Sequence, residues 1–242
     1  MTELVVDKKR SSNPIIAAQS FYQGLKMLAK PEFRKYLIIP VLINLWLFGS
    51  LFFIGSYYFE WMIGQFIPEW LDWLSWVLWP LFFLSLSITF FFTFTLIANL
   101  LSAPFYGKLA KKTLLAITDN PLLINEPPLT RVFLGESKRF IYLITRSLPL
   151  LLLFIIPGLN LFAPFLWALF GAWGMTLEFL GYPMENEGLV FTEQRQLVKS
   201  MRIGALSFGG IVVLGLMIPV LNILVPPAAV IGATIYLQEV KA

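Results

Sequence analysis

Four long stretches of this sequence contain no charged residue. They cover residues 36–59, 73–107, 147–177 and 203–238, which are 24, 35, 31 and 36 residues long. A helix needs about 20 consecutive apolar residues to cross the hydrocarbon core of a bilayer, which is about 30 Å thick. Each stretch is long enough for at least one crossing, so the sequence predicts an all-α integral membrane protein.

The composition supports this class and excludes several others. Of the 242 residues, 58% are hydrophobic and 13% are charged, and the mean hydropathy is +0.77, far from the average soluble domain. The chain has no Cys and no His, which removes thiolate chemistry and the usual general base and metal ligand. It also lacks a P-loop sequence. We therefore expect no cofactor, no metal, no nucleic-acid partner, no enzymatic activity and no ATP hydrolysis by this chain.

The distribution of Lys and Arg predicts the orientation in the membrane. Seven of these residues lie in residues 1–36, none in 60–72, and seven in 108–146. Cytoplasmic segments of membrane proteins carry an excess of Lys and Arg. We therefore expect the N-terminus in the cytoplasm.

The same pattern predicts the elements of the first part of the chain. Apolar residues recur at helical spacing before the first long stretch, which is typical of an amphipathic helix in the membrane interface. The predicted elements are an interfacial helix over 14–29, long transmembrane helices over 31–59 and 73–107, and a polar cytoplasmic helical segment over 108–146.

The two later uncharged stretches contain a repeated motif. I-P-G-L-N-L-F-A-P at residues 156–164 and I-P-V-L-N-I-L-V-P at residues 218–226 are identical at five of nine positions, at an offset of 62 residues. Proline ends a helix and asparagine can cap the next one, so each motif predicts a helix–turn–helix.

The lengths of these stretches favour half-crossings. Two full crossings need roughly 40 apolar residues, more than either stretch holds. We predict re-entrant helical hairpins over 147–177 and 203–238 that turn inside the membrane, where irregular backbone must be buried in protein or line a wet cavity. The alternative is short full crossings in a locally thinned bilayer. Both interpretations place the C-terminus in the cytoplasm.

Several motifs together resemble those of one known family. They are F-Y-Q-G-L-K from Phe21, P-E-F-R-K-Y-L-I-I-P-V-L-I-N from Pro31, A-P-F-Y-G from Ala103, I-P-G-L-N-L-F-A-P-F-L-W from Ile156, Y-P-M-E-N from Tyr182, G-A-L-S-F-G from Gly204 and G-A-T from Gly232. This set resembles the CysZ family of bacterial sulfate permeases, from about residue 20 to about residue 237.

The resemblance implies uptake of sulfate across the bacterial inner membrane for cysteine biosynthesis. It also implies two long transmembrane helices, two pairs of membrane-dipping helices and a homo-oligomer in contact with membrane lipids. Transport would be channel-like or ion-coupled, and a related oxyanion is a possible substrate. One alternative is a membrane scaffold or insertase-like protein without transport activity. Another is a lipid-modifying enzyme, whose base would have to be a carboxylate or a Lys.

The resemblance and the residues together predict a sulfate site near the N-terminus. The family's G-L-R motif stands here as Gly24, Leu25 and Lys26, which keeps the charge but loses the bidentate geometry of Arg. Further cations follow where the first long helix begins, and a helix N-terminus with nearby cations favours anions. The alternative is that these cations only fix the orientation and contact anionic lipid headgroups. The predicted site consists of Gly24, Leu25, Lys26, Lys30, Arg34 and Lys35.

Other polar residues are candidates for the transport path. A stripe of cations at i, i+4 and i+7 could line the inner mouth of a pore or form a solvated helix face. The asparagines of the two repeats could line the pore or cap helices, and carboxylates close to the membrane boundary could exchange protons to couple transport. The pore-lining candidates are Arg195, Lys199, Arg202, Asn160 and Asn222, and the coupling candidates are Glu178, Glu185 and Glu187.

Overall fold

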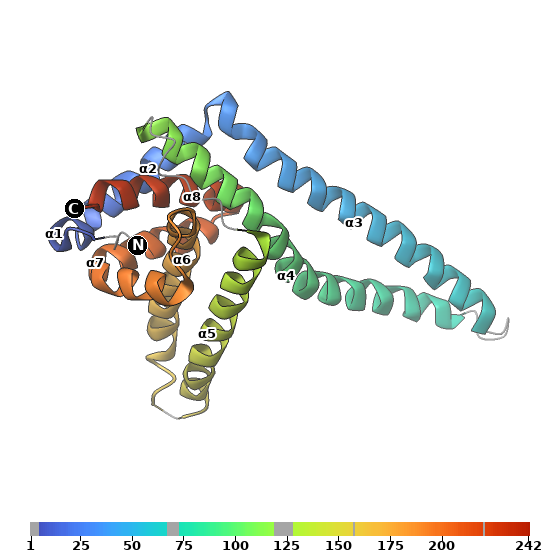
Figure 1. Cartoon of the computed structure of the whole chain (residues 1–242). Coiled ribbons are helices and arrows are strands. Elements are labelled where there is room, and N and C mark those ends of the chain that lie inside the picture. Colours follow the sequence, from blue (N-terminus) through green and yellow to red (C-terminus); the bar gives the residue numbers. More distant parts are fainter. Residues whose placement is uncertain (1–4, 67–72, 119–127, 157, 220) are drawn as a thin grey trace. The chain divides into compact units, whose positions relative to one another are not determined.

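The computed structural model describes residues 5–66, 73–118, 128–156, 158–219 and 221–242. Within these ranges the chain is helical apart from turns and one isolated bridge between Val6 and Lys241. The prediction of an all-α chain is therefore confirmed for this part. The helices are α1 (Lys8–Ser11), α2 (Pro14–Leu28), α3 (Pro31–Phe66), α4 (Ser75–Thr118), α5 (Leu129–Ile155), α6 (Ala163–Asn186), α7 (Phe191–Leu216) and α8 (Leu221–Val240) (Figure 1).

Three helices of the described chain are long and apolar enough to cross a membrane. They are α6, α7 and α8. A membrane protein is thus supported by helix length and composition as well as by the hydropathy of the whole sequence.

The helices divide into two compact units. One unit holds residues up to Leu37 together with Ala103–Ala242, and the other holds Ile38–Ser102. In the second unit, aromatic rings of α3 and α4 pack together, with Phe59 stacked on Phe82 at 4.0 Å between ring centroids. An open apolar groove of about 460 Å³ lies beside these rings.

Helix α8 is the core of the first unit. Its most apolar 18-residue window is 72% buried, against 39% for the corresponding windows of α6 and α7. It packs against α2, α6 and α7, and Figure 1 shows α2 running beside it. A helix that is covered on several sides has no need of a polar face, which agrees with its uniformly apolar sequence.

Glycines allow the helices of the first unit to touch through their backbones. A Cβ atom added at Gly24 of α2 would meet the backbone of Ala228 and Gly232 in α8, and one added at Gly232 would lie 2.8 Å from the Cα atom of Phe21. In the same way, a methyl group at Gly209 of α7 would collide with the carbonyl oxygen of Ala172 in α6. Small residues are what close helix crossings in membranes select.

The two ends of the chain are joined to each other in this unit. The backbone N–H of Asp7 donates to the carbonyl of Val240 at 2.8 Å, and that of Ala242 donates to Val5 at 3.1 Å. The hydroxyl of Tyr236 donates to the carbonyl of Ser11 at 2.6 Å. These bonds hold α1 against the end of α8.

Helix α5 crosses the border that the charge pattern predicts at residue 146. It is one continuous helix of 27 residues, about 40 Å long at 1.5 Å per residue. The border therefore separates charged from uncharged residues and does not end a helix. The helix as a whole is long enough for a full crossing. The predicted half-crossing assumes that only its uncharged part, from residue 147, enters the membrane, and this stays a prediction.

The two repeats fold differently at their asparagines. Asn160 lies in the turn between α5 and α6, close to Gly158 with its φ of 85°. Helix α6 has Phe162 as its N-cap and no side-chain cap hydrogen bond, so the expected capping by Asn160 is wrong. In the sequence, the second repeat has Val220 in place of Gly158. There α8 begins earlier, and Asn222 lies inside its first turn.

We predict that Gly209→Ala destabilises the protein, because the added methyl group would overlap the carbonyl of Ala172. Overpacking of this kind typically costs about 1–3 kcal/mol. The matched control is Gly210→Ala, since nothing lies within 4 Å of a Cβ atom at that position. Thermal unfolding in detergent should show a lower Tm for Gly209→Ala only. Equal Tm values for the two variants would contradict the close crossing of α6 and α7.

Candidate functional site

The cations predicted to bind sulfate lie at the junction of α2 and α3. Lys26, Lys30, Arg34 and Lys35 are all exposed. The ammonium group of Lys26 lies 4.5 Å from the ring centroid of Tyr22. Four exposed cations within ten residues make this junction strongly positive, which attracts anions from solution.

The two other residues of the predicted site face the interior. Gly24 is buried against α8, and Leu25 packs against the apolar core. Their contacts anchor α2, so any direct contact with an anion at this junction falls to the cations.

A further lysine, from α4, joins the junction. The ammonium group of Lys112 donates to the carbonyl of Glu32 at 2.7 Å and lies 3.9 Å from its carboxylate. It also lies 5.0 Å from the ring centroid of Phe33. Lys112 thus partly neutralises the carboxylate in the first turn of α3, which leaves the positive charge of the junction in excess.

The predicted stripe on α7 is interrupted at its last member. Arg195 stacks on the ring of Tyr142 at 5.2 Å, and Lys199 is exposed. Arg202 has φ 49° and ψ −117°, where the helix kinks. Since the kink rotates the following residues, the spacing of i, i+4 and i+7 does not place Arg202 on the same straight face.

The three candidate coupling carboxylates lie in different surroundings. Glu185 is in an ion pair with Arg139 at 3.3 Å. Glu187 accepts from Lys241 at 2.5 Å and from Gln238 at 2.9 Å. Glu178 lies within electrostatic range of Arg139. Two of the three are therefore already engaged by cations.

Arg139 is the centre of a buried polar network that the sequence analysis missed. It is 2% exposed. Its Nη1 donates to both carboxylate oxygens of Glu136, at 2.8 and 3.0 Å, and its Nη2 donates to Glu185 at 3.3 Å. The absence of a side chain at Gly181 makes room for the guanidinium, because a methyl group there would collide with it.

These carboxylates stabilise the positive charge of Arg139. Burial would lower its pKa, but the neighbouring carboxylates of Glu136 and Glu185 outweigh burial and raise the pKa above its ordinary value. A local sequence signal existed, since Glu136 and Arg139 are three residues apart on one helix face. The partner of Arg139 on α6, Glu185, is 46 residues away, so no local sequence pattern predicts this contact.

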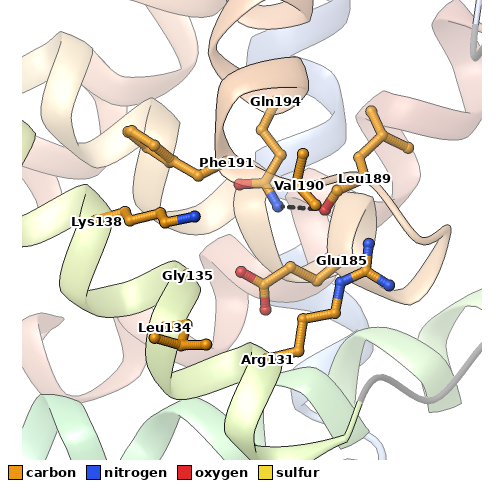
Figure 2. Close-up of a pocket in the computed structure, with 9 residues that line it drawn as sticks. All are labelled: Arg131, Leu134, Gly135, Lys138, Glu185, Leu189, Val190, Phe191 and Gln194. Carbon is orange, nitrogen blue, oxygen red and sulfur yellow. Dashed lines mark hydrogen bonds between the residues drawn. The ribbon is translucent and has the colours of Figure 1, made fainter.

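A cavity of about 100 Å³ lies beside this network, between α5 and the turn from α6 to α7. Figure 2 shows Lys138 from α5 and Glu185 from α6 extending toward it. The amide nitrogen of Gln194 donates to the carbonyl of Leu189 at 3.1 Å, while its buried oxygen has no hydrogen-bond partner in the described chain. The volume is sufficient for several water molecules.

Comparison with known proteins identifies the family. The model of the family described as "Sulfate transporter CysZ/Etoposide-induced protein 2.4" matches residues 20–227. This chain belongs to that family. The resemblance to CysZ proteins noted in the sequence is thereby confirmed.

Individual members of the CysZ family are similar over nearly the whole chain. A protein of Pseudomonas fluorescens (strain Pf0-1) named sulfate transporter CysZ is 37% identical over 235 residues, covering 92% of this chain and 93% of the relative. A protein of the same name from Pectobacterium atrosepticum is 34% identical over 223 residues, covering 88% and 81%. The alignments thus cover about nine-tenths of this chain.

We predict that Arg139→Met lowers stability strongly, because it leaves the half-buried carboxylates of Glu136 and Glu185 without their cation. Breaking a buried ion pair from one side costs about 3–5 kcal/mol. Lys138→Met is the matched control. Lys138 is the adjacent residue in the chain, its side chain is exposed, and exposed charges contribute little to stability. Chemical denaturation should separate the two variants. Similar stabilities would contradict a buried network centred on Arg139.

Proposed function

We propose that this chain takes up sulfate across the bacterial inner membrane and supplies it for cysteine biosynthesis. The observation that carries the proposal is 34–37% identity, over about 90% of the chain, to proteins named sulfate transporter CysZ. The excess of cations at the α2–α3 junction supports it, because a doubly charged anion needs fixed positive charge in place of its water. Without a P-loop, movement is channel-like or coupled to an ion gradient.

The proposed topology has the charged ends of the helices on the cytoplasmic side. Helices α3 and α4 contain the two long transmembrane segments, and both termini face the cytoplasm. The apolar parts of the pairs α5–α6 and α7–α8 enter the membrane as re-entrant hairpins with Asn160 and Asn222 near their tips. Hairpins that meet near the midplane are a known way to build a transport site.

The proposed entrance site is the α2–α3 junction, with Lys26, Lys30, Arg34 and Lys35 as the anion-binding side chains. Gly24 and Leu25 hold α2 in place beneath them. Arg195, Lys199 and Arg202 lie along the inner part of the path, and Glu178, Glu185 and Glu187 are the groups that could couple transport to protons. We also propose that the protein assembles as a homo-oligomer within the lipid bilayer. Proton coupling is proposed because these carboxylates lie near the membrane boundary. The homo-oligomer is proposed from the resemblance to the family.

The function is tested by uptake of labelled sulfate into liposomes that contain only the purified protein. We expect uptake well above that of empty liposomes, and inhibition by unlabelled sulfate in excess of that by chloride or phosphate at equal concentration. An imposed pH gradient should change the rate if the carboxylates couple transport to protons. Uptake equal to that of empty liposomes would contradict transport and favour a scaffold or insertase-like protein.

We predict that Lys26→Glu lowers the stabilisation of the protein by sulfate, because it places a negative charge in the entrance site. A ligand at a hundredfold its Kd stabilises by about 2.7 kcal/mol, which a thermal-shift assay detects as a higher Tm. Lys9→Glu, at an exposed position of α1, makes the same change of charge away from the junction and should retain the shift. An undiminished shift in Lys26→Glu would remove Lys26 from the site.

A further inference from the structure

Two arginines from different helices lie beside the ring of Tyr142 on α5. The guanidinium carbon of Arg195 on α7 lies 5.2 Å from its ring centroid, and that of Arg146 on α5 lies 5.9 Å away. The ring of Phe191 supports it edge-on at 5.7 Å. Both guanidinium carbons lie within 6 Å of one ring centroid, so they are at most about 11 Å apart. We call Tyr142, Arg146 and Arg195 the patch.

No carboxylate of the described chain forms an ion pair with either arginine. The described ion pairs use Glu32, Glu136, Glu185 and Glu187, all with other cations. Glu193, which precedes Arg195 on the same helix, accepts a hydrogen bond from the backbone of Val190 at 2.8 Å and is committed to the start of α7. The patch therefore holds two positive charges that the folded chain does not neutralise.

The arginines are held by the aromatic ring instead. A cation over an aromatic face is attracted to it without losing its charge, whereas a carboxylate partner would cancel that charge. The Nε atom of Arg195 is buried and has no hydrogen-bond partner among the described residues. Buried donors without a partner are uncommon, and each calls for a water or a ligand.

The surroundings extend this positive charge along α5. Arg131, Lys138, Tyr142 and Arg146 follow one another at intervals of seven, four and four residues, which places them on one face of the helix. The first two line the cavity of Figure 2, and Phe191 belongs to both the cavity and the patch. These residues, from Arg131 beside the cavity to Arg146, extend over about 22 Å of helix.

We propose that Tyr142, Arg146 and Arg195 form a second oxyanion site, in which the two guanidinium groups beside the ring bind a tetrahedral dianion of the sulfate class. Arginine suits such a ligand because its planar fork donates two parallel hydrogen bonds to oxyanion oxygens. Two monovalent cations match the charge of one dianion. The site lies on other helices than the α2–α3 junction, so it would be a separate station on the path, and it rests on the proposed function only for the identity of the anion.

The site is tested first by chemical footprinting of the unmodified protein in detergent. Phenylglyoxal modifies arginine side chains, and peptide mass spectrometry reports the rate at each one. We expect sulfate to slow the modification of Arg146 and Arg195 several-fold, and to leave the exposed Arg10 unaffected. Chloride at matched ionic strength should not protect. Unchanged rates, or equal protection by chloride, would overturn the site.

An anionic lipid could supply the same chemistry through its phosphate. A parallel footprint with phosphatidylglycerol in place of sulfate separates the two sources. Protection by sulfate in the absence of this lipid supports the site as proposed. Protection by the lipid alone would overturn it and assign the patch to headgroup binding.

Variants give a second readout. In a Lys26→Glu background, which removes the entrance site, labelled sulfate should bind R146Q/R195Q at least about tenfold more weakly than the same chain with both arginines, since hydrogen bonds to charged groups are lost. R146K/R195K should recover part of the affinity, because charge returns without the planar fork. K9Q/R10Q removes the same charge from α1 and should bind normally. If R146Q/R195Q does not fold, the footprint on the unmodified chain decides.

The failure of this site and the failure of the proposed function have different signatures. Protection of Arg146 and Arg195 by sulfate, with no uptake into liposomes, would leave the site standing and contradict transport. Normal uptake without protection would leave transport standing and overturn the site.

Discussion

Backbone contact between helices at glycines is the constraint on which the first unit depends. Gly24 and Gly232 let α2 lie directly on α8, and Gly209 lets α7 lie directly on α6. In a membrane, apolar side chains gain little by leaving lipid for protein, so close packing and polar contacts must hold the helices together. The buried hydrogen bond from Thr176 to the carbonyl of Ala205, at 2.5 Å, is one such polar contact between α6 and α7.

Arginines of α5 and α7 form two groups, which lie in different surroundings in this packing. Arg139 is enclosed with two carboxylates, and its role is to join α5 to α6. Arg146 and Arg195 are held by a ring and keep their charge. A buried ion pair tolerates little change, whereas a cation without a carboxylate partner is available to an incoming anion. We therefore assign stability to the first group, and the second group forms the proposed oxyanion site.

The sequence predicted the helical membrane class and the turn between the later helices, because hydropathy and proline are local signals, and its motifs carried the resemblance to the CysZ family. It could not predict Arg139 as a buried residue, since its partner Glu185 comes from a distant part of the chain. It also misjudged Asn160, because the choice of N-cap depends on how Gly158 bends the turn. The sequence did not predict the continuity of α5 for a third reason. A change from charged to apolar side chains looks like the end of a helix, but such a change does not interrupt the backbone hydrogen bonds.

The central proposal is that the helix pairs α5–α6 and α7–α8 enter the membrane, turn inside it and return to the cytoplasmic side. The chain has no cysteine, so single cysteines at Asn160 and Asn222 can be labelled in intact cells without background. A membrane-impermeant maleimide added from the periplasmic side should leave both tips unmodified. A cysteine at Lys9 should react only after the cells are opened. Rapid labelling of both tips from outside would show full crossings and contradict the account.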